Sequence, residues 1–105
     1  MTNPVKESDI QRQIKDYLQW QGWYCFKIHQ SALSYKGIAD LYAIKAGRSL
    51  WIEVKTPHSR SKQSPEQIKF GCAILAHGGE YIVAKSVDDV ERCLAAAALS
   101  KPDKA

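Results

Sequence analysis

Long apolar runs are missing from this chain of 105 residues. A membrane-spanning helix needs about 18 consecutive apolar residues, and no segment approaches that length, so we expect no membrane partner. The N-terminal segment, residues 1–7, also lacks the apolar stretch of a secretory signal peptide. These two absences together predict a cytoplasmic protein.

Cysteine is scarce. The three cysteines are Cys25, Cys72 and Cys93, and no two of them form a C-x-x-C pair. An odd number of cysteines at such wide spacing indicates neither a disulfide framework nor a zinc ribbon. We therefore expect three reduced thiols, all of them buried.

Acidic residues are outnumbered. Lys and Arg total 15 against 11 for Asp and Glu, which gives a net charge of +4 and modestly favours a polyanionic partner. Hydrophobic residues make up 45% and charged residues 25% of the chain, which is ordinary for a soluble globular domain and excludes extensive disorder. The length allows a single domain over residues 1–99, followed by a polar tail over residues 100–105.

The first predicted element is an amphipathic helix over residues 7–21. Its apolar residues recur at spacings of three and four, and Gly22 follows it as a stop signal. Its start is open, because Asn3-Pro4 would cap it early, whereas Ser8 with Gln11 forms a capping box that would begin it later. Only the early start places residue 7 inside the helix.

The rest of the chain alternates between strand and helix signals. Ser64-Pro65-Glu66-Gln67 combines a serine cap, a proline at the first helical position and a capping-box glutamine. We expect strands over residues 23–28, 38–45, 48–56 and 81–84, a second helix from Ser64 to about His77, and a third helix after Ser86 that buries Val87, Val90, Cys93, Leu94 and Ala97. The order αβββαβα predicts an α/β fold, with a mixed four-stranded sheet flanked by helices.

The predicted hairpin brings two carboxylates together. If Ala46-Gly47 is a two-residue turn, Lys45 lies opposite Arg48, and counting outward places Asp40 opposite Glu53. Like charges at this separation destabilise a sheet unless a positive charge lies between them. A divalent cation is a natural candidate, because Mg²⁺ is often held by one or two carboxylates together with water and phosphate oxygens.

Lys55 lies on the same face of the strand as Glu53, because side chains alternate with a period of two. Trp51 shares this face, and Ile52 and Val54 point to the other. Two carboxylates and a lysine suit metal-assisted hydrolysis of a phosphate ester. From spacing alone, a solvated hairpin face with a Glu–Lys pair is an equally good interpretation.

These residues resemble a known nuclease core. Asp40, followed after twelve residues by Glu53-Val54-Lys55, resembles the PD-(D/E)XK nucleases, and a wider pattern resembles their VRR-NUC branch, the virus-type replication-repair nucleases. The chain departs from that branch at Ala39, where the family usually has proline. The wider pattern consists of Glu7 with Ile10-Gln11, Gly22-Trp23, Lys36-Gly37 with Asp40-Leu41, Ile52-Glu53-Val54-Lys55, and Ser64-Pro65-Glu66-Gln67.

The resemblance implies a restriction-endonuclease-like core and Mg²⁺ or Mn²⁺ as cofactor. It assigns Asp40, Glu53 and the carbonyl of Val54 as metal ligands and Lys55 as a catalytic lysine. It also assigns supporting catalytic roles to Glu7 and Gln67. From the residues alone, Glu7 is more simply an acidic residue that complements a helix N-terminus, and Gln67 closes a capping box whether or not it also reaches the site.

Four basic residues flank the predicted site and are candidate DNA-phosphate contacts: Lys36, Arg60, Lys62 and Lys69. For each of them a solvated basic loop is an equally good interpretation. Taken together, the resemblance and the site residues predict a metal-dependent DNA endonuclease, selective for branched or junction DNA, that acts in replication, repair or recombination.

Two alternatives to this function stay open. One is a catalytically inactive DNA-binding module that kept the fold, and the other is a Holliday-junction resolvase or restriction-type enzyme of the same superfamily. Because one small domain offers little surface for duplex DNA, a homodimer is also predicted, with Trp20, Trp23 or the last helix as its interface. The resemblance further suggests a bacterial or phage-infected cell as the source.

Overall fold

The computed structural model describes residues 5–31, 33–57 and 62–100. Its elements follow the predicted order αβββαβα. The strands form one sheet in the order β1-β2-β3-β4, antiparallel between the first three and parallel between β3 and β4, so the predicted mixed four-stranded sheet is confirmed. The elements are α1 (Glu7–Trp20), β1 (Tyr24–Lys27), β2 (Leu41–Lys45), β3 (Arg48–Val54), α2 (Pro65–Ala76), β4 (Glu80–Ala84) and α3 (Val87–Ser100).

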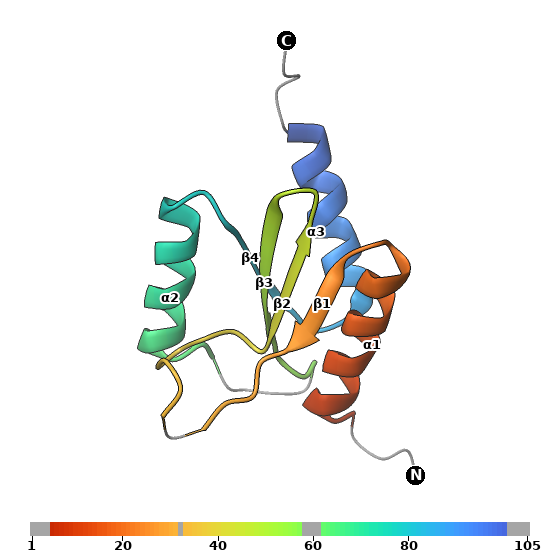
Figure 1. Cartoon of the computed structure of the whole chain (residues 1–105). Helices are drawn as coiled ribbons and strands as arrows, with labels where there is room; N and C mark the ends of the chain where they lie inside the picture. Colours follow the sequence, from red (N-terminus) through yellow and green to blue (C-terminus); the bar gives the residue numbers. More distant parts are fainter. Residues whose placement is uncertain (1–4, 32, 58–61, 101–105) are drawn as a thin grey trace.

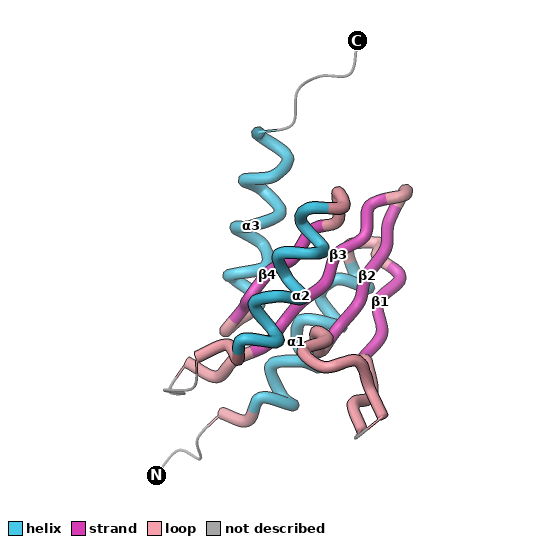
Figure 2. The backbone as a smooth tube through the Cα atoms, turned by 90° about the vertical axis from the view of Figure 1, so that its left-hand side faces the viewer, coloured by secondary structure: helices cyan, strands magenta, loops and turns pink. Residues whose placement is uncertain are grey.

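Helices cover both faces of the sheet, but unequally. Helices α1 and α3 lie on one face and α2 lies on the other, as Figure 1 and the turned view in Figure 2 show. The hydrophobic core fills the α1/α3 side, where alternate residues of β3, Leu50, Ile52 and Val54, are fully buried against the α1 stripe. The opposite face of β3 therefore carries Trp51 and Glu53 toward α2, as the period of two predicts.

Helix α1 begins at Glu7. Lys6 occupies the N-cap position and makes no side-chain cap, so Ser8 lies inside the helix rather than capping it. Asn3 and Pro4 lie outside the described residues. The helix ends as predicted, with Gln21 at the C-cap and Gly22 in the left-handed region at φ 89°. The early start keeps Glu7 in the first turn.

The hairpin between β2 and β3 has the predicted turn. Ala46 and Gly47 both have positive φ, 50° and 81°, as a primed two-residue turn requires. The register runs from Lys45 opposite Arg48 to Leu41 opposite Ile52. Both strands are shorter than the ranges 38–45 and 48–56 that the sequence predicts. Beyond Leu41 the regular ladder of backbone hydrogen bonds between them ends, because Val54 N donates to the side-chain carboxylate of Asp40 instead of to a backbone carbonyl.

Three sequence predictions about burial are wrong. Cys25 is buried as expected, but Cys72 and Cys93 are exposed. Cys93 is exposed because α3 packs along a narrow seam, with Val90 buried and Leu94 half-buried. Trp23 lies in the core at 6% exposure, which removes it as an interface residue.

The C-terminal helix α3 extends to Ser100, one residue into the predicted tail, and residues 101–105 lie outside the described part of the chain. Within the described segments, no helix has both the length and the apolar character needed to cross a bilayer.

Candidate active site

Two buried carboxylates meet where β2 begins and β3 ends. Glu53 is 2% exposed and Asp40 is 8% exposed. The register ends at Leu41 opposite Ile52, and Asp40 N also donates to Ile52 O at 3.0 Å, so the ladder is irregular at Asp40 and does not continue to a direct Asp40–Glu53 pair. The two carboxyl side chains nevertheless meet through a hydrogen bond. The Asp40 carboxylate is fixed at both oxygens, because Val54 N donates to Oδ2 at 2.7 Å and Gln30 Nε2 donates to Oδ1 at 3.2 Å.

The electrostatics of this pair favour a positive charge. Burial, and next the neighbouring carboxyl of Asp40, raise the pKa of Glu53 to about 9, and the ammonium of Lys55 opposes this shift. Without a bound cation, a carboxyl with so high a pKa is neutral at pH 7. It becomes a carboxylate when a cation binds beside it. The pair is therefore preorganised to accept a cation rather than to form a stable ion pair within the sheet.

Gln67 links helix α2 to the acidic pair. Its Nε2 donates to Glu53 Oε2 at 2.9 Å, and its Oε1 accepts from the backbone N of Ser64 at 2.9 Å. Ser64 Oγ in turn accepts from Gln67 N, which completes the predicted capping box. The same oxygen of Gln67 also accepts from Lys55 Nζ at 3.4 Å. One glutamine thus caps the helix and orients both Glu53 and Lys55.

Glu7 faces the same cluster from the first turn of α1. Partial burial and the charge of Asp40 raise the pKa of the Glu7 carboxyl, while Lys55 and Lys27 lower it. Its side chain is nonetheless exposed to solvent. Glu7 therefore stands at the rim of the acidic pair, and its place in the first turn also complements the helix N-terminus. The supporting catalytic role of Glu7 stays a prediction.

The donor set fits a hard divalent cation. Within the described part of the chain, no three His, Cys, Asp or Glu side chains are grouped closely enough to hold a metal by themselves. Mg²⁺ needs fewer protein ligands, because it commonly takes one or two carboxylates and fills its remaining positions with water and substrate phosphate oxygens. Asp40 and Glu53 supply two such carboxylates. Because burial and Asp40 raise the pKa of Glu53, a cation beside the pair would stabilise its ionised form.

The predicted DNA-contacting residues are only partly brought together. Lys36 and Lys69 are exposed and line one groove with the aromatic rings of Tyr35 and Phe70. Lys62 is exposed in the segment before the Ser64 cap. Arg60 lies outside the described residues.

A glycine holds the loop that carries Asp40 against helix α2. Gly37 has φ of 82°, and a Cβ at this position would overlap the backbone carbonyl of Glu66. The loop at Gly37 therefore approaches the first turn of α2 backbone to backbone. This close approach fixes the start of β2, and with it Asp40, relative to Gln67.

Two further residues lie near the pair that no sequence pattern predicts. Gln30 donates to the carboxylate of Asp40 and to the carbonyl of Ile38 from ten and eight residues away along a loop. Tyr81 packs against Phe70, and its hydroxyl accepts a hydrogen bond from Gln63 Nε2 at 3.0 Å. Burial and then the charge of Glu53 raise the pKa of Tyr81 to about 12. The loop before β2 brings Gln30 to the site, and strand β4 brings Tyr81 there.

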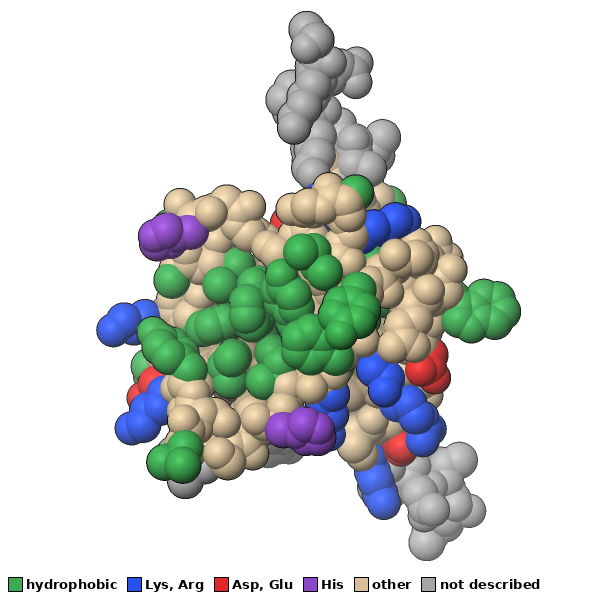
Figure 3. Space-filling model, viewed as in Figure 1, with side chains coloured by type: hydrophobic (Ala, Val, Ile, Leu, Met, Phe, Trp, Pro, Cys, Tyr) green, Lys and Arg blue, Asp and Glu red, His purple; other side chains and the backbone are tan. Residues whose placement is uncertain are grey.

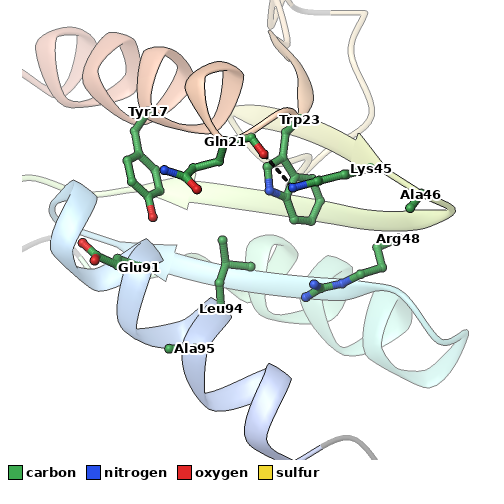
Figure 4. A pocket seen from close by; sticks show the side chains of 9 residues that line it. All are labelled: Tyr17, Gln21, Trp23, Lys45, Ala46, Arg48, Glu91, Leu94 and Ala95. Atoms are coloured by element: carbon green, nitrogen blue, oxygen red, sulfur yellow. Dashed lines mark hydrogen bonds between the residues drawn. The ribbon is translucent and has the colours of Figure 1, made fainter. Parts of the chain in front are cut away.

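A different hollow lies at the hairpin end of the sheet (Figure 4). There Lys45 Nζ donates to the carbonyl of Gln21 at 2.6 Å, and the guanidinium of Arg48 lies over the Trp23 ring at 5.3 Å. Among the described residues that line it, Glu91 is the only acid. Arg48 also forms an ion pair with Glu80 at 2.8 Å, so the charges at this end differ from the paired carboxyls of Asp40 and Glu53.

Comparison with known proteins identifies the fold. No protein-family profile and no curated protein matches the chain. A solved structure described as "VRR_NUC domain" matches with a TM-score of 0.70 and 22% identity over 87% of this chain and 96% of that one. A second, described as "VRR_NUC domain protein", matches with a TM-score of 0.67 and 20% identity over 89% of this chain and 88% of that one. The chain therefore has the VRR_NUC fold, with the restriction-endonuclease-like arrangement that the sequence predicts.

Proposed function

We propose that this protein is a metal-dependent DNA endonuclease that hydrolyses phosphodiester bonds. The observation that carries the proposal is the buried Asp40–Glu53 pair with Lys55 beside it, at one end of the sheet. The shared fold supports a nuclease domain, because both structural neighbours are VRR_NUC domains. The alternative of a solvated hairpin face does not agree with carboxylates that are 2% and 8% exposed.

Asp40 and Glu53 would hold Mg²⁺ or Mn²⁺, with the carbonyl of Val54 as a further candidate ligand. Such a cation polarises a phosphoryl oxygen and lowers the pKa of a water bound to it. The protein contributes the fixed geometry: Val54 N and Gln30 hold Asp40, and Gln67 holds Glu53. These hydrogen bonds orient the two carboxylates before substrate arrives.

Lys55 supplies the positive charge of the site. Its ammonium donates to Gln67 Oε1 and lies beside Glu53. From this position it can orient an attacking water, or stabilise the negative charge that develops on the phosphate in the transition state. Glu7, at the rim, can accept a hydrogen bond from that water and so supports the same step.

DNA is the proposed substrate, with Lys36, Lys62, Lys69 and Arg60 as contacts to its phosphates. Each such contact releases counterions, so binding should weaken steeply as salt rises. We propose a preference for branched or junction DNA, as in replication, repair or recombination. A Holliday-junction resolvase or a restriction-type enzyme would use the same catalytic residues.

We also propose that two copies of the chain pair. The half of the sheet that α2 leaves uncovered carries exposed apolar side chains, including Tyr24, Phe26 and Ile44, and Figure 3 shows an apolar surface there. Trp20 is a second candidate, since it is 90% exposed. Light scattering should show a dimer at micromolar concentration. A fully active monomer under the same conditions would exclude this pairing.

The test of function is cleavage of labelled linear, flapped and four-way-junction DNA in Mg²⁺, Mn²⁺ or EDTA. Wild type should cut at least one substrate when the metal is present, and Asp40→Ala and Lys55→Ala should not. Tight, metal-independent binding of the same DNA without cutting would instead indicate an inactive DNA-binding module.

A further inference from the structure

A polar pocket, separate from the two hollows described above, lies between α1 and the end of β1. These two elements lie next to each other in Figure 1. The pocket has a volume of about 230 Å³, and every ionisable side chain that lines it is basic. Its lining residues are Ser8, Gln11, Arg12 and Lys15 from α1, and Lys27 from β1.

Gln11 is the least ordinary residue of this pocket. It is 7% exposed, and within the described residues its buried Oε1 has no hydrogen-bond partner. Nearly all buried polar groups in folded proteins are paired, and an unpaired one costs about 1 to 3 kcal/mol. Because the two ends of an amide have almost the same shape, a rotated side chain can turn its NH₂ group toward a ligand instead. In that rotated form the amide adds a donor to the basic side chains of Arg12, Lys15 and Lys27, and such a set of donors suits an anionic ligand with several oxygens.

The pocket lies on the same face of α1 as Glu7, at the rim of the proposed active site. Gln11 follows Glu7 by one helical turn, so the two side chains lie on the same face of α1. Lys27, at the end of β1, acts electrostatically on the Glu7 carboxyl from the pocket side. Arg12 is partly engaged by Asp9 at 3.7 Å, and its side chain is 67% exposed. A strand of DNA whose scissile phosphate lies at Asp40 and Glu53 would therefore pass this pocket.

We propose that the pocket formed by Gln11, Lys15, Lys27, Arg12 and Ser8 binds a phosphate of the DNA backbone next to the phosphate that is cut. This assignment rests on the proposed nuclease function and adds the site that sets the register of the strand. The ligand chemistry is a phosphate monoanion or dianion, which an internal phosphate or a terminal 5′-phosphate could supply. Hydrogen bonds from lysine and amide groups hold either one.

The test is a scan of single methylphosphonates, which remove the charge of one internal phosphate at a time. Binding is measured by fluorescence anisotropy in Mg²⁺, in a Lys55→Gln background that keeps the DNA intact. The test variants are Lys27→Gln and Gln11→Leu. The control is Lys45→Gln, because Lys45 carries the same charge at the hairpin end of the sheet and contacts Gln21 there.

In the protein that carries only Lys55→Gln, a methylphosphonate at one position near the cut should weaken binding by about fivefold to tenfold. This is the scale of a charge-assisted hydrogen bond lost at a surface pocket. In the Lys27→Gln protein, the methylphosphonate at this position should cause no further loss of affinity. The slope of the logarithm of the binding constant against the logarithm of salt concentration should also be smaller by about 0.9, because one phosphate contact is lost. In the Lys45→Gln protein, the methylphosphonate should weaken binding as before. Gln11→Leu should reduce this loss of affinity without lowering the melting temperature, because it removes the unpaired group.

An identical methylphosphonate profile in the Lys27→Gln and Lys45→Gln proteins would overturn the assignment. A penalty found only with a 5′-phosphorylated end, and at no internal position, would assign the pocket to a terminal phosphate and overturn the backbone proposal. If wild type neither binds nor cuts any DNA, the nuclease function itself fails. If wild type cuts DNA but Lys27→Gln leaves the profile unchanged, only the pocket assignment fails.

Discussion

The acidic pair predicts an unusual pH dependence of stability in the metal-free protein. In the folded chain burial raises the pKa of Glu53 to about 9, against an ordinary value of 4.5. Between these values the folded state holds a proton that the unfolded state releases, so this carboxyl makes the free energy of unfolding fall as pH rises. The limiting slope for one group is about 1.4 kcal/mol per pH unit. From about pH 5.5 to about pH 7.5, Glu53 should therefore remove about 2 to 3 kcal/mol of stability.

The perturbation is Glu53→Gln, which keeps a side-chain oxygen for Gln67 Nε2 but cannot ionise. Urea unfolding in EDTA, from about pH 5 to about pH 9, should show wild type losing stability relative to the variant across this window. Adding Mg²⁺ should stabilise wild type most at high pH and affect the variant much less, because the cation binds the ionised pair. Parallel pH curves for the two proteins in EDTA would refute the reasoning, since they would show that Glu53 does not titrate within the folded site.

Two further substitutions test how the site is held. Gln67→Ala and Ser64→Ala should each cost about 1 kcal/mol of stability in urea unfolding, because both break the capping box. Only Gln67→Ala should also reduce cleavage strongly, since it removes the contact to Glu53, and equal activity losses in the two variants would contradict this division. Gly37→Ala should lower the melting temperature by several degrees through overlap with the Glu66 carbonyl, and unchanged thermal unfolding would show that the loop does not approach α2 this closely.

Much of the site follows from local rules that the sequence displays. The two-residue turn Ala46-Gly47 sets the register of the hairpin as far as Leu41 opposite Ile52, which brings Asp40 and Glu53 to the same end of the sheet. The irregular step at Asp40, whose backbone N donates to Ile52 O, is not predicted by the turn. The period of two then places Lys55 on the same face. The capping-box pattern predicted the start of α2 at Pro65, and because that helix packs beside the end of β3, its glutamine reaches Glu53.

The remainder depends on contacts that no local pattern encodes. Gln30 reaches Asp40 only because the loop over residues 28–40 folds back, and that path depends on the approach of Gly37 to Glu66. The exposure of Cys93 depends on how little of α3 the sheet covers. The sequence does not predict that the side-chain oxygen of Gln11 is buried without a partner, because there Gln11 is an ordinary helix residue.

The most direct test of the central claim is the single-turnover cleavage rate of one labelled DNA substrate by wild type and by Lys55→Gln, each in Mg²⁺ and in EDTA. Wild type should cut in Mg²⁺ only. The rate should be lower by at least about 100-fold in Lys55→Gln, which is the scale of losing one electrostatic or proton-transferring group. Cutting that persists in EDTA, or that proceeds at the wild-type rate in Lys55→Gln, would contradict a nuclease site built from Asp40, Glu53 and Lys55.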